Sequence, residues 1–348
     1  MKIVSIIGAR PQFIKAAVIS KELEKRDGIE DVIVHTGQHY DENMSKIFFD
    51  ELEIPHPNYN LEVGSGLHGA QTAAMLEKTE QILLDEKPDW VLVYGDTNST
   101  IAGALAATKL HIKIAHVEAG LRSFNKLMPE EINRITTDRI SDLLLVPSQN
   151  AMELLKKENL SEYAIFTGDV MFDSILFYQK MAEEKYSLES ITNEKEFYLA
   201  TVHRAENTDD KERLQNIFST FSDMDKSVVL PLHPRTKSKL DGIKFNDNIK
   251  IIEPVSYLEM ILLLKKTSKV LTDSGGLQKE AYFMKKPCIT MRDETEWIET
   301  LNGNWNFIVG ANKQLIMDKI NITKFDEQKE YYGNGNAGKN IVDALLKF

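Results

Sequence analysis

The chain has 348 residues, of which 42% are hydrophobic and 27% are charged. These values are ordinary for a globular protein and exclude a disordered, collagen-like or coiled-coil chain. The net charge of −11, from 53 acidic and 42 basic residues, opposes nonspecific binding to a nucleic-acid backbone. Nucleic acid is therefore not an expected partner, although a few local cations could still hold a small anion.

The apolar stretches are no longer than strands, so we expect no membrane-spanning segment. The beginning of the chain is too short and too soon polar for a signal peptide. One cysteine, Cys288, leaves no internal disulfide framework and no Cys-based zinc site. We therefore expect a cytoplasmic protein that does not bind membranes.

Short apolar runs alternate with longer amphipathic segments through the first half of the chain. The predicted strands are 3–7, 31–36, 90–94, 112–117, 143–146 and 164–167. The predicted helices are 12–26, 68–86, 98–110, 130–141, 149–158 and 172–184. Because the strands are nearly continuous in Val, Ile and Leu, we expect them to be buried on both faces of a parallel sheet.

Residues 185–196 lose this periodicity and are a candidate linker. The alternation then resumes, with predicted strands at 197–202, 228–232, 249–252, 270–272, 288–291 and 307–309 and an amphipathic helix at 337–346. The sequence thus predicts an α/β fold of two Rossmann-like, doubly wound domains. Such domains place their functional loops at the carboxyl ends of the strands, facing a cleft.

The loop after the first strand carries two cations. It lacks the G-x-G-x-x-G pattern of a dinucleotide-binding turn, so an NAD site is not indicated. Arg10 and Lys15 could instead meet an anionic ligand. A surface Arg and a solvated helix Lys are the alternative interpretation.

Three carboxylates follow neighbouring strands. Asp96 comes after strand 90–94, where it could also be the N-cap of the next helix. Glu118 directly follows strand 112–117, and Glu130 opens a helix, where the helix dipole favours an acid. Each position has a structural explanation, but three carboxylates on adjacent loops shift one another's pKa values and suit proton transfer.

His203 and Arg204 follow strand 197–202, where a His-Arg pair could stabilise the charge of a leaving group. A lone His is more often structural. The chain has no zincin His pair and no EF-hand loop, so we expect no metal ion.

The segment Thr272–Glu280 holds the most specific local pattern. A strand ends, Ser274, Gly275 and Gly276 allow close backbone approach, and a helix begins. This arrangement predicts an anion cradle made of backbone N–H groups, with Glu280 able to accept hydrogen bonds from sugar hydroxyls. The alternative is an ordinary βα turn capped by Ser or Asp.

Seven motifs then occur in a recognisable order. They are Gly-Ala-Arg-Pro-Gln at 8–12, Thr-Gly-Gln-His at 36–39, Gly-Asp-Thr at 95–97, His-Val-Glu-Ala-Gly-Leu-Arg at 116–122, Pro-Glu-Glu-x-Asn-Arg at 129–134, His-Arg at 203–204 and Asp-Ser-Gly-Gly-x-Gln-x-Glu at 273–280. Together they resemble the non-hydrolysing UDP-N-acetylglucosamine 2-epimerases over nearly the whole chain.

The resemblance implies a GT-B-like pair of Rossmann domains whose cleft binds a UDP-sugar. Residues 1–170 would carry the catalytic carboxylates, 171–332 would bind UDP, and 333–348 would form a helix that crosses back to the first domain. The family inverts C2 by eliminating UDP to give a 2-acetamidoglucal and then adding UDP back, with the proton delivered to the opposite face. It needs no cofactor and no metal, and a homodimer is usual.

The resemblance also assigns roles to residues. The catalytic residues would be Asp96, Glu118, Glu130 and His203. The substrate-binding residues would be Arg10, Lys15, Arg204, Ser274, Gly275, Gly276 and Glu280. Residues for allosteric activation by substrate would be Gln38, His39, Gln71 and His233.

One departure concerns the substrate. Where the UDP-N-acetylglucosamine enzymes typically read Thr-Glu-Arg-Pro-Glu, this chain reads Thr-Glu-Trp-Ile-Glu at 295–299, so Trp297 replaces an arginine. An indole cannot supply the charged fork of a guanidinium. The pattern looks like the branch acting on UDP-2,3-diacetamido-2,3-dideoxy-D-glucuronate, and both sugars are candidate substrates.

Three other functions fit the same motifs. A hydrolysing relative would release UDP and the free 2-epimeric sugar. A glycosyltransferase of the same architecture would pass the sugar to an acceptor. A noncatalytic sensor would bind the sugar nucleotide without turnover.

Overall fold

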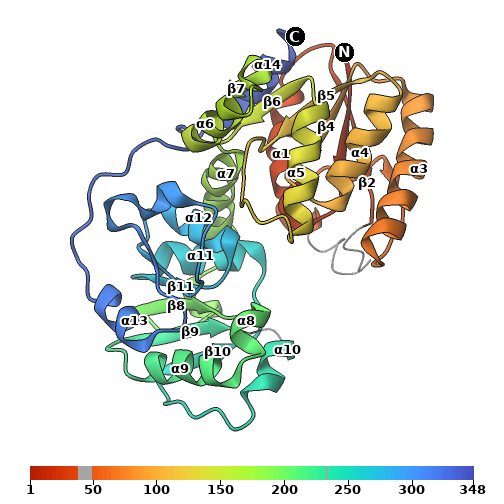
Figure 1. Ribbon diagram of the computed structural model, residues 1–348. Coiled ribbons are helices and arrows are strands. Elements are labelled where there is room, and N and C mark those ends of the chain that lie inside the picture. The colour runs from red at the N-terminus through yellow and green to blue at the C-terminus, as the bar shows by residue number, and fades with distance from the viewer. Residues whose placement is uncertain (38–48, 233) are drawn as a thin grey trace. The chain divides into compact units, whose positions relative to one another are not determined.

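A computed structural model describes residues 1–37, 49–232 and 234–348 (Figure 1). The chain divides into two compact units, Met1–Ser174 with Glu330–Phe348, and Ile175–Lys329. Helix α7 (Val170–Lys185) begins in the first unit and ends in the second. The polar segment 185–196 that the sequence suggested as a linker therefore lies inside the second unit.

The first unit is built on a seven-stranded sheet in the order β3-β2-β1-β4-β5-β6-β7. Every strand pair in it is parallel. The strands are β1 Lys2–Ile7, β2 Glu30–His35, β3 Tyr59–Asn60, β4 Trp90–Tyr94, β5 Lys113–Val117, β6 Leu143–Val146 and β7 Ala164–Phe166. The sequence predicted all of them except β3, whose two residues are too few to show a pattern.

The helices of this unit cover both faces of the sheet. They are α1 Arg10–Leu23, α3 His68–Glu86, α4 Asn98–Lys109, α5 Pro129–Ile140, α6 Gln149–Lys157, α14 Ala337–Leu345 and the short η1 Ser161–Tyr163. Helices α3, α4 and α5 lie side by side, and α1 packs against α14 (Figure 1). Asp173 of α7 accepts hydrogen bonds from the amides of Ala337 and Gly338, at 3.0 and 2.8 Å, and so caps α14 from outside.

The second unit holds a six-stranded sheet in the order β10-β9-β8-β11-β12-β13, with all pairs parallel. The strands are β8 Phe197–Thr201, β9 Ser227–Pro231, β10 Ile249–Ile252, β11 Val270–Thr272, β12 Cys288–Thr290 and β13 Asn306–Ile308. The helices are α8 Ala205–Thr208, α9 Lys211–Ser222, α10 Pro234–Lys237, α11 Tyr257–Lys266, α12 Gly275–Phe283, α13 Lys313–Ile320, η2 Leu188–Ser190, η3 Ser238–Leu240 and η4 Ile298–Asn304.

Strand β8 shows why these sequences are continuously apolar. Tyr198 and Ala200 join the core on the side of α9 and α13, whereas Phe197 and Leu199 join the core beneath α11 and α12. Successive side chains of a strand point to opposite faces, so a strand covered on both sides needs an apolar residue at every position. The predicted α/β fold with two parallel-sheet units is thereby confirmed. In the described part of the chain, no helix is long and apolar enough to cross a membrane.

Candidate active site

Gln12 joins the loops that follow β1 and β4. Its side-chain oxygen accepts hydrogen bonds from the amides of Gly8 and Ala9, at 2.8 and 3.0 Å. Its nitrogen donates to the carbonyl of Tyr94 at 2.6 Å and lies 3.0 Å from the Thr97 hydroxyl. Because this amide is buried and fully engaged, it fixes the two loops relative to each other.

Asp96 is not the N-cap of α4. Thr97 takes that position, and its hydroxyl accepts the hydrogen bond from the amide of Thr100. The half-buried Asp96 carboxylate instead pairs with the buried Arg134, with 3.0 Å between Oδ2 and Nη2. The interpretation of Asp96 as an N-cap is therefore wrong. Its carboxylate pairs with a side chain and does not cap the helix.

The surroundings of Asp96 favour the protonated form. Burial raises the pKa of its carboxyl above the ordinary value, and the charge of Arg134 opposes this shift. The negative charges of Glu118 and Glu130 raise it further, whereas Lys15 lowers it. A carboxyl that is brought toward neutrality beside other carboxylates suits both the donation and the removal of a proton.

Glu118 lies on a strained loop directly after β5. Its φ of +72° is in the left-handed region that side chains with a Cβ rarely occupy. Its carboxylate Oε2 contacts the ammonium of Lys15, and both side chains are largely shielded from solvent. A Cβ at Gly95 would lie 3.5 Å from the same oxygen, so the loop before Asp96 approaches Glu118 closely. The structure thus brings Lys15 and Glu118 together beside the Asp96 loop.

The two acids that open α5 have different surroundings. Glu130 is exposed, whereas Glu131 is buried and accepts hydrogen bonds from the amides of Ser123 and Phe124, both at 2.9 Å. Glu131 also lies 3.5 Å from Arg134 Nε. Glu131 therefore holds the loop before the helix, and Glu130 remains open to a ligand. The catalytic role of Glu130 stays a prediction.

Replacing Arg134 with Gln is expected to raise the pKa of Asp96, because the change removes the positive charge that opposes burial. The Asp96 carboxyl signal, followed by ¹³C NMR, should titrate at higher pH in this variant than in the parent. Arg139→Gln on the same helix is the matched control, since Arg139 is half exposed and pairs with Glu158. An unchanged Asp96 titration in Arg134→Gln would contradict the expectation.

Asp273, at the end of β11, organises the His203 loop. Its fully buried carboxylate accepts hydrogen bonds from the amides of His203 and Arg204, both at 3.0 Å, and lies 3.0 Å from His203 Nδ1. Although burial opposes ionisation, the hydrogen bond from His203 holds the pKa of Asp273 below its ordinary value. About half of the His203 side chain is exposed, so the ring is oriented by Asp273 and accessible to a ligand.

The start of α12 has the features expected of an anion cradle. Ser274 caps the helix, its hydroxyl accepting from the amide of Leu277. A Cβ at Gly275 would lie 3.6 Å from Arg292 Nη1 and 3.9 Å from Arg204 Nη2. The buried Arg292 makes two 3.0 Å contacts with Glu296, and its Nε has no hydrogen-bond partner among the described residues. Two guanidinium groups therefore border the helix N-terminus, where negative charge is stabilised, together with Glu296 Oε2 at 3.9 Å from the same Cβ position.

Glu280 lies one turn into the same helix and is buried. Burial raises the pKa of its carboxyl to about 7, while Lys279 and Tyr257 oppose the shift. The Tyr257 hydroxyl lies 3.4 Å from Glu280 Oε1. On the neighbouring position, the Lys279 ammonium stands 3.9 Å from the ring centroid of Trp297, a cation–π contact. Where the enzymes that the motifs resemble typically carry an arginine, this chain thus has an indole with a lysine over its face.

The remaining predicted residues are placed as follows. Arg10 is exposed at the first position of α1. Gln71 is buried, donating to the carbonyl of Gly64 at 2.9 Å and accepting from Asn98 at 2.8 Å. Gln38, His39 and His233 lie outside the described residues. The allosteric assignment therefore stays a prediction.

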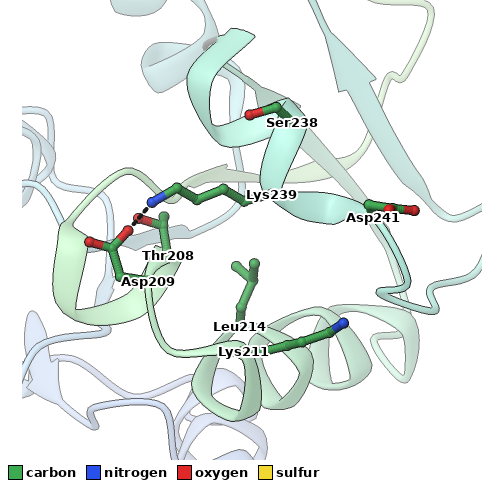
Figure 2. Close-up of a pocket in the computed structure, with 7 residues that line it drawn as sticks. All are labelled: Thr208, Asp209, Lys211, Leu214, Ser238, Lys239 and Asp241. Atoms are coloured by element: carbon green, nitrogen blue, oxygen red, sulfur yellow. Dashed lines mark hydrogen bonds and ion pairs between the residues drawn. The ribbon is translucent and has the colours of Figure 1, made fainter.

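A surface pocket of about 460 Å³ in the second unit contains none of the predicted site residues (Figure 2). Lys239 and Asp209 form an ion pair across it. Its lining residues are Thr208, Asp209, Lys211, Leu214, Ser238, Lys239 and Asp241. With two lysines, two aspartates and one apolar side chain, it has no preference for a ligand of one charge.

Sequence reasoning gave no role to four residues that organise the site, namely Gln12, Arg134, Asp273 and Arg292. Three of them lie inside quoted motifs, in Gly-Ala-Arg-Pro-Gln, Pro-Glu-Glu-x-Asn-Arg and Asp-Ser-Gly-Gly. The motifs could therefore have pointed to these three residues. Their partners lie on other loops, however, and spacing along the chain does not reveal them.

Comparison with known proteins finds similarity to the same group of 2-epimerases over nearly the whole chain. Residues 21–346 match the family model described as UDP-N-acetylglucosamine 2-epimerase. A UDP-N-acetylglucosamine 2-epimerase homolog of Methanococcus maripaludis is 56% identical over 99% of both chains. The UDP-2,3-diacetamido-2,3-dideoxy-D-glucuronate 2-epimerase of Pseudomonas aeruginosa is 50% identical over 100% of both.

A solved structure also matches the chain over its full length. The Methanocaldococcus jannaschii UDP-GlcNAc 2-epimerase, in complex with UDP-GlcNAc and UDP, superposes with a TM-score of 0.89 at 46% identity and covers 100% of both chains. The resemblance of the motifs, the two-unit α/β fold and these matches agree. The chain belongs to the UDP-N-acetylglucosamine 2-epimerase family.

Proposed function

We propose that this protein inverts C2 of a UDP-2-acetamido sugar without net hydrolysis. The observation that carries the proposal is the arrangement of Asp96 and Glu118 on adjacent loops of one sheet edge, with Arg134 and Lys15 beside them. Burial raises the pKa of Asp96, and the charge of Glu118 raises it further. Such a pair can remove a proton from one face of a carbon and deliver one to the other.

The proposed reaction has two halves. In the first, a carboxylate takes the C2 proton, the C2–H electron pair becomes the C1=C2 double bond, and the C1–O bond to the β-phosphate breaks to release UDP. In the second, UDP oxygen re-forms the bond to C1 and a carboxyl on the opposite face protonates C2. Asp96, Glu118 and Glu130 are the proposed acid and base groups, with no cofactor or metal.

The departing diphosphate needs positive charge in the transition state. The resemblance of the motifs suggests Arg10, Lys15, His203 and Arg204 as the proposed source. Ser274 and the amides of Gly275 and Gly276 would hold UDP at the start of α12, and Glu280 would accept from ribose hydroxyls. The orientation of His203 by Asp273 supports its part in this set.

Two sugars are the candidates for the substrate. By name, the Methanocaldococcus jannaschii enzyme acts on UDP-GlcNAc and the Pseudomonas aeruginosa enzyme acts on UDP-2,3-diacetamido-2,3-dideoxy-D-glucuronate. Trp297 in place of an arginine supports a sugar other than N-acetylglucosamine, although Lys279 keeps a positive charge against the indole. Both candidate sugar nucleotides belong in the test.

The test is to incubate the purified protein with each sugar nucleotide in deuterium oxide and to follow C2 by NMR. We expect inversion at C2 with incorporation of deuterium from solvent, and UDP retained in the product. Turnover without solvent exchange would overturn the mechanism. Stoichiometric free UDP would indicate the hydrolysing reaction, transfer only with an acceptor would indicate a glycosyltransferase, and binding without turnover would indicate a sensor.

We further propose that the enzyme works as a homodimer in the cytoplasm and supplies a sugar nucleotide for polysaccharide biosynthesis. The homodimer is what membership of the family leads us to expect. The cytoplasmic location agrees with a chain whose described helices include none that could span a membrane.

A further inference from the structure

His116 and Asp138 form an ion pair in the interior of the first unit, next to the proposed catalytic loops. Neither side chain is exposed to solvent. His116 is the fourth residue of β5 and Asp138 lies on α5. The distance between His116 Nδ1 and Asp138 Oδ1 is 2.7 Å, and His116 Nε2 is 2.7 Å from the carbonyl oxygen of Gly95.

Both ring nitrogens of His116 face acceptors. A backbone carbonyl can only accept, so Nε2 must carry a proton. The other oxygen of Asp138 accepts from the amide of Gly120 at 3.1 Å and from Arg122 at 2.7 Å, which stabilises the ionised carboxylate. Although burial raises it, the hydrogen bonds and charges of His116 and Arg122 together keep the pKa of Asp138 below its ordinary value. Nδ1 must therefore carry a proton as well.

Arg122 completes the charge balance around this pair. Besides Asp138, it makes two contacts with Glu158, at 2.7 and 2.9 Å. His116 and Arg122 thus carry two positive charges that face the buried Asp138 and the partly exposed Glu158, and Glu158 also pairs with Arg139 at the surface. A buried pair with balanced charge and complete hydrogen bonds is costly to break from one side.

The pair also holds the backbone on both sides of the proposed catalytic residues. Gly95, whose carbonyl His116 binds, directly precedes Asp96. Gly120, whose amide Asp138 binds, comes two residues after Glu118. Gly95, Glu118 and Gly120 all have left-handed φ values, of +61°, +72° and +84°. For Glu118 such a conformation is strained and persists only where its surroundings impose it.

We infer that His116, as a doubly protonated imidazolium paired with Asp138, is a positioning residue that holds the Asp96 and Glu118 loops in the geometry needed for proton transfer. It touches no reacting atom. Its effect on turnover rests on the proposed function, whereas its protonation state and its hold on the two loops do not.

The kinetic test is His116→Gln. A glutamine has one donor group and one acceptor and cannot bridge two acceptors on opposite sides, so the loops lose a clamp. We expect kcat to fall about 100-fold, the effect of misplacing a catalytic group by about 1 Å, with KM nearly unchanged. His56→Gln is the matched control, because His56 forms an exposed pair with Asp50 in the same unit. A His116→Gln variant with parental kcat would overturn the inference.

A second measurement does not depend on turnover. In the parent protein at pH 7, ¹⁵N NMR should show protons on both His116 nitrogens, as their two acceptor contacts require. In Asp138→Asn, which keeps the shape but removes the charge, one of the two protons should be lost and kcat should fall in the same way. A neutral imidazole in the parent protein at pH 7 would overturn the inference. If no epimerase activity is found with either sugar, this spectrum still decides the protonation state and the proposed function fails separately.

Discussion

Glu118→Gln is expected to lower kcat for C2 epimerisation by about 10²–10⁴-fold, the range for loss of a general acid or base. The amide keeps the size of the side chain but cannot exchange a proton with C2. It also leaves the Lys15 ammonium beside a neutral group in place of its carboxylate partner. The rate should be measured as deuterium incorporation at C2, which reports the proton transfer directly.

The matched control for Glu118→Gln is Glu62→Gln. Glu62 also has a left-handed backbone, with φ of +52°, and is exposed. Any cost of placing Gln in this conformation is therefore common to both variants. Affinity for UDP, measured by calorimetry, should change far less than kcat in Glu118→Gln, because only Lys15, its ion-pair partner, belongs to the groups proposed to hold the diphosphate. Full activity of Glu118→Gln would remove this residue from the mechanism.

The fold was largely predictable because each sheet is covered on both faces. Full burial forces a continuous apolar run, and the predicted strand at 143–146 coincides with β6, as the one at 270–272 does with β11. The two-residue β3 was missed because its pairing with β2 depends on register, with Val34 opposite Tyr59, and not on composition.

The candidate site was predictable by position but not by contact. The sequence placed Asp96 and Glu118 at the carboxyl ends of strands, and that placement is correct. It did not reveal that Thr97 caps α4 and leaves Asp96 to pair with Arg134. Propensity ranks Asp above Thr as an N-cap, so the choice of Thr97 depends on the tertiary pairing of Asp96 and not on propensity.

The partners of buried charged side chains are equally hard to predict from sequence. His116 and Asp138 are 22 residues apart and meet only because α5 packs over the end of β5. A sequence pattern shows the motif that contains His116, but it does not show a partner on another element. Buried polar residues that pair across different elements can therefore be identified only from the structure.

Glu280→Gln is expected to make the second unit more stable above pH 7. The folded state raises the pKa of Glu280 from 4.5 to about 7, chiefly through burial. Below pH 4.5 the carboxyl is neutral in both the folded and the unfolded state, and it contributes no pH dependence. Between these values only the unfolded chain ionises freely, so the parent loses stability as pH rises. The loss levels off above pH 7 at about 3 kcal/mol.

Glutamine does not ionise, so Glu280→Gln should escape this loss. Hydrogen exchange of the slowest amides of β8 and β11, compared between variant and parent at the same pH, measures the difference. The variant should gain protection at pH 8 relative to pH 5, whereas β1 and β4 of the first unit should be unchanged. Glu184→Gln, at an exposed position of α7, is the control. A gain that is the same at both pH values would contradict the assigned ionisation. If Glu280 also binds ribose, the variant should bind UDP more weakly, which would mean that a destabilising buried acid is kept for binding.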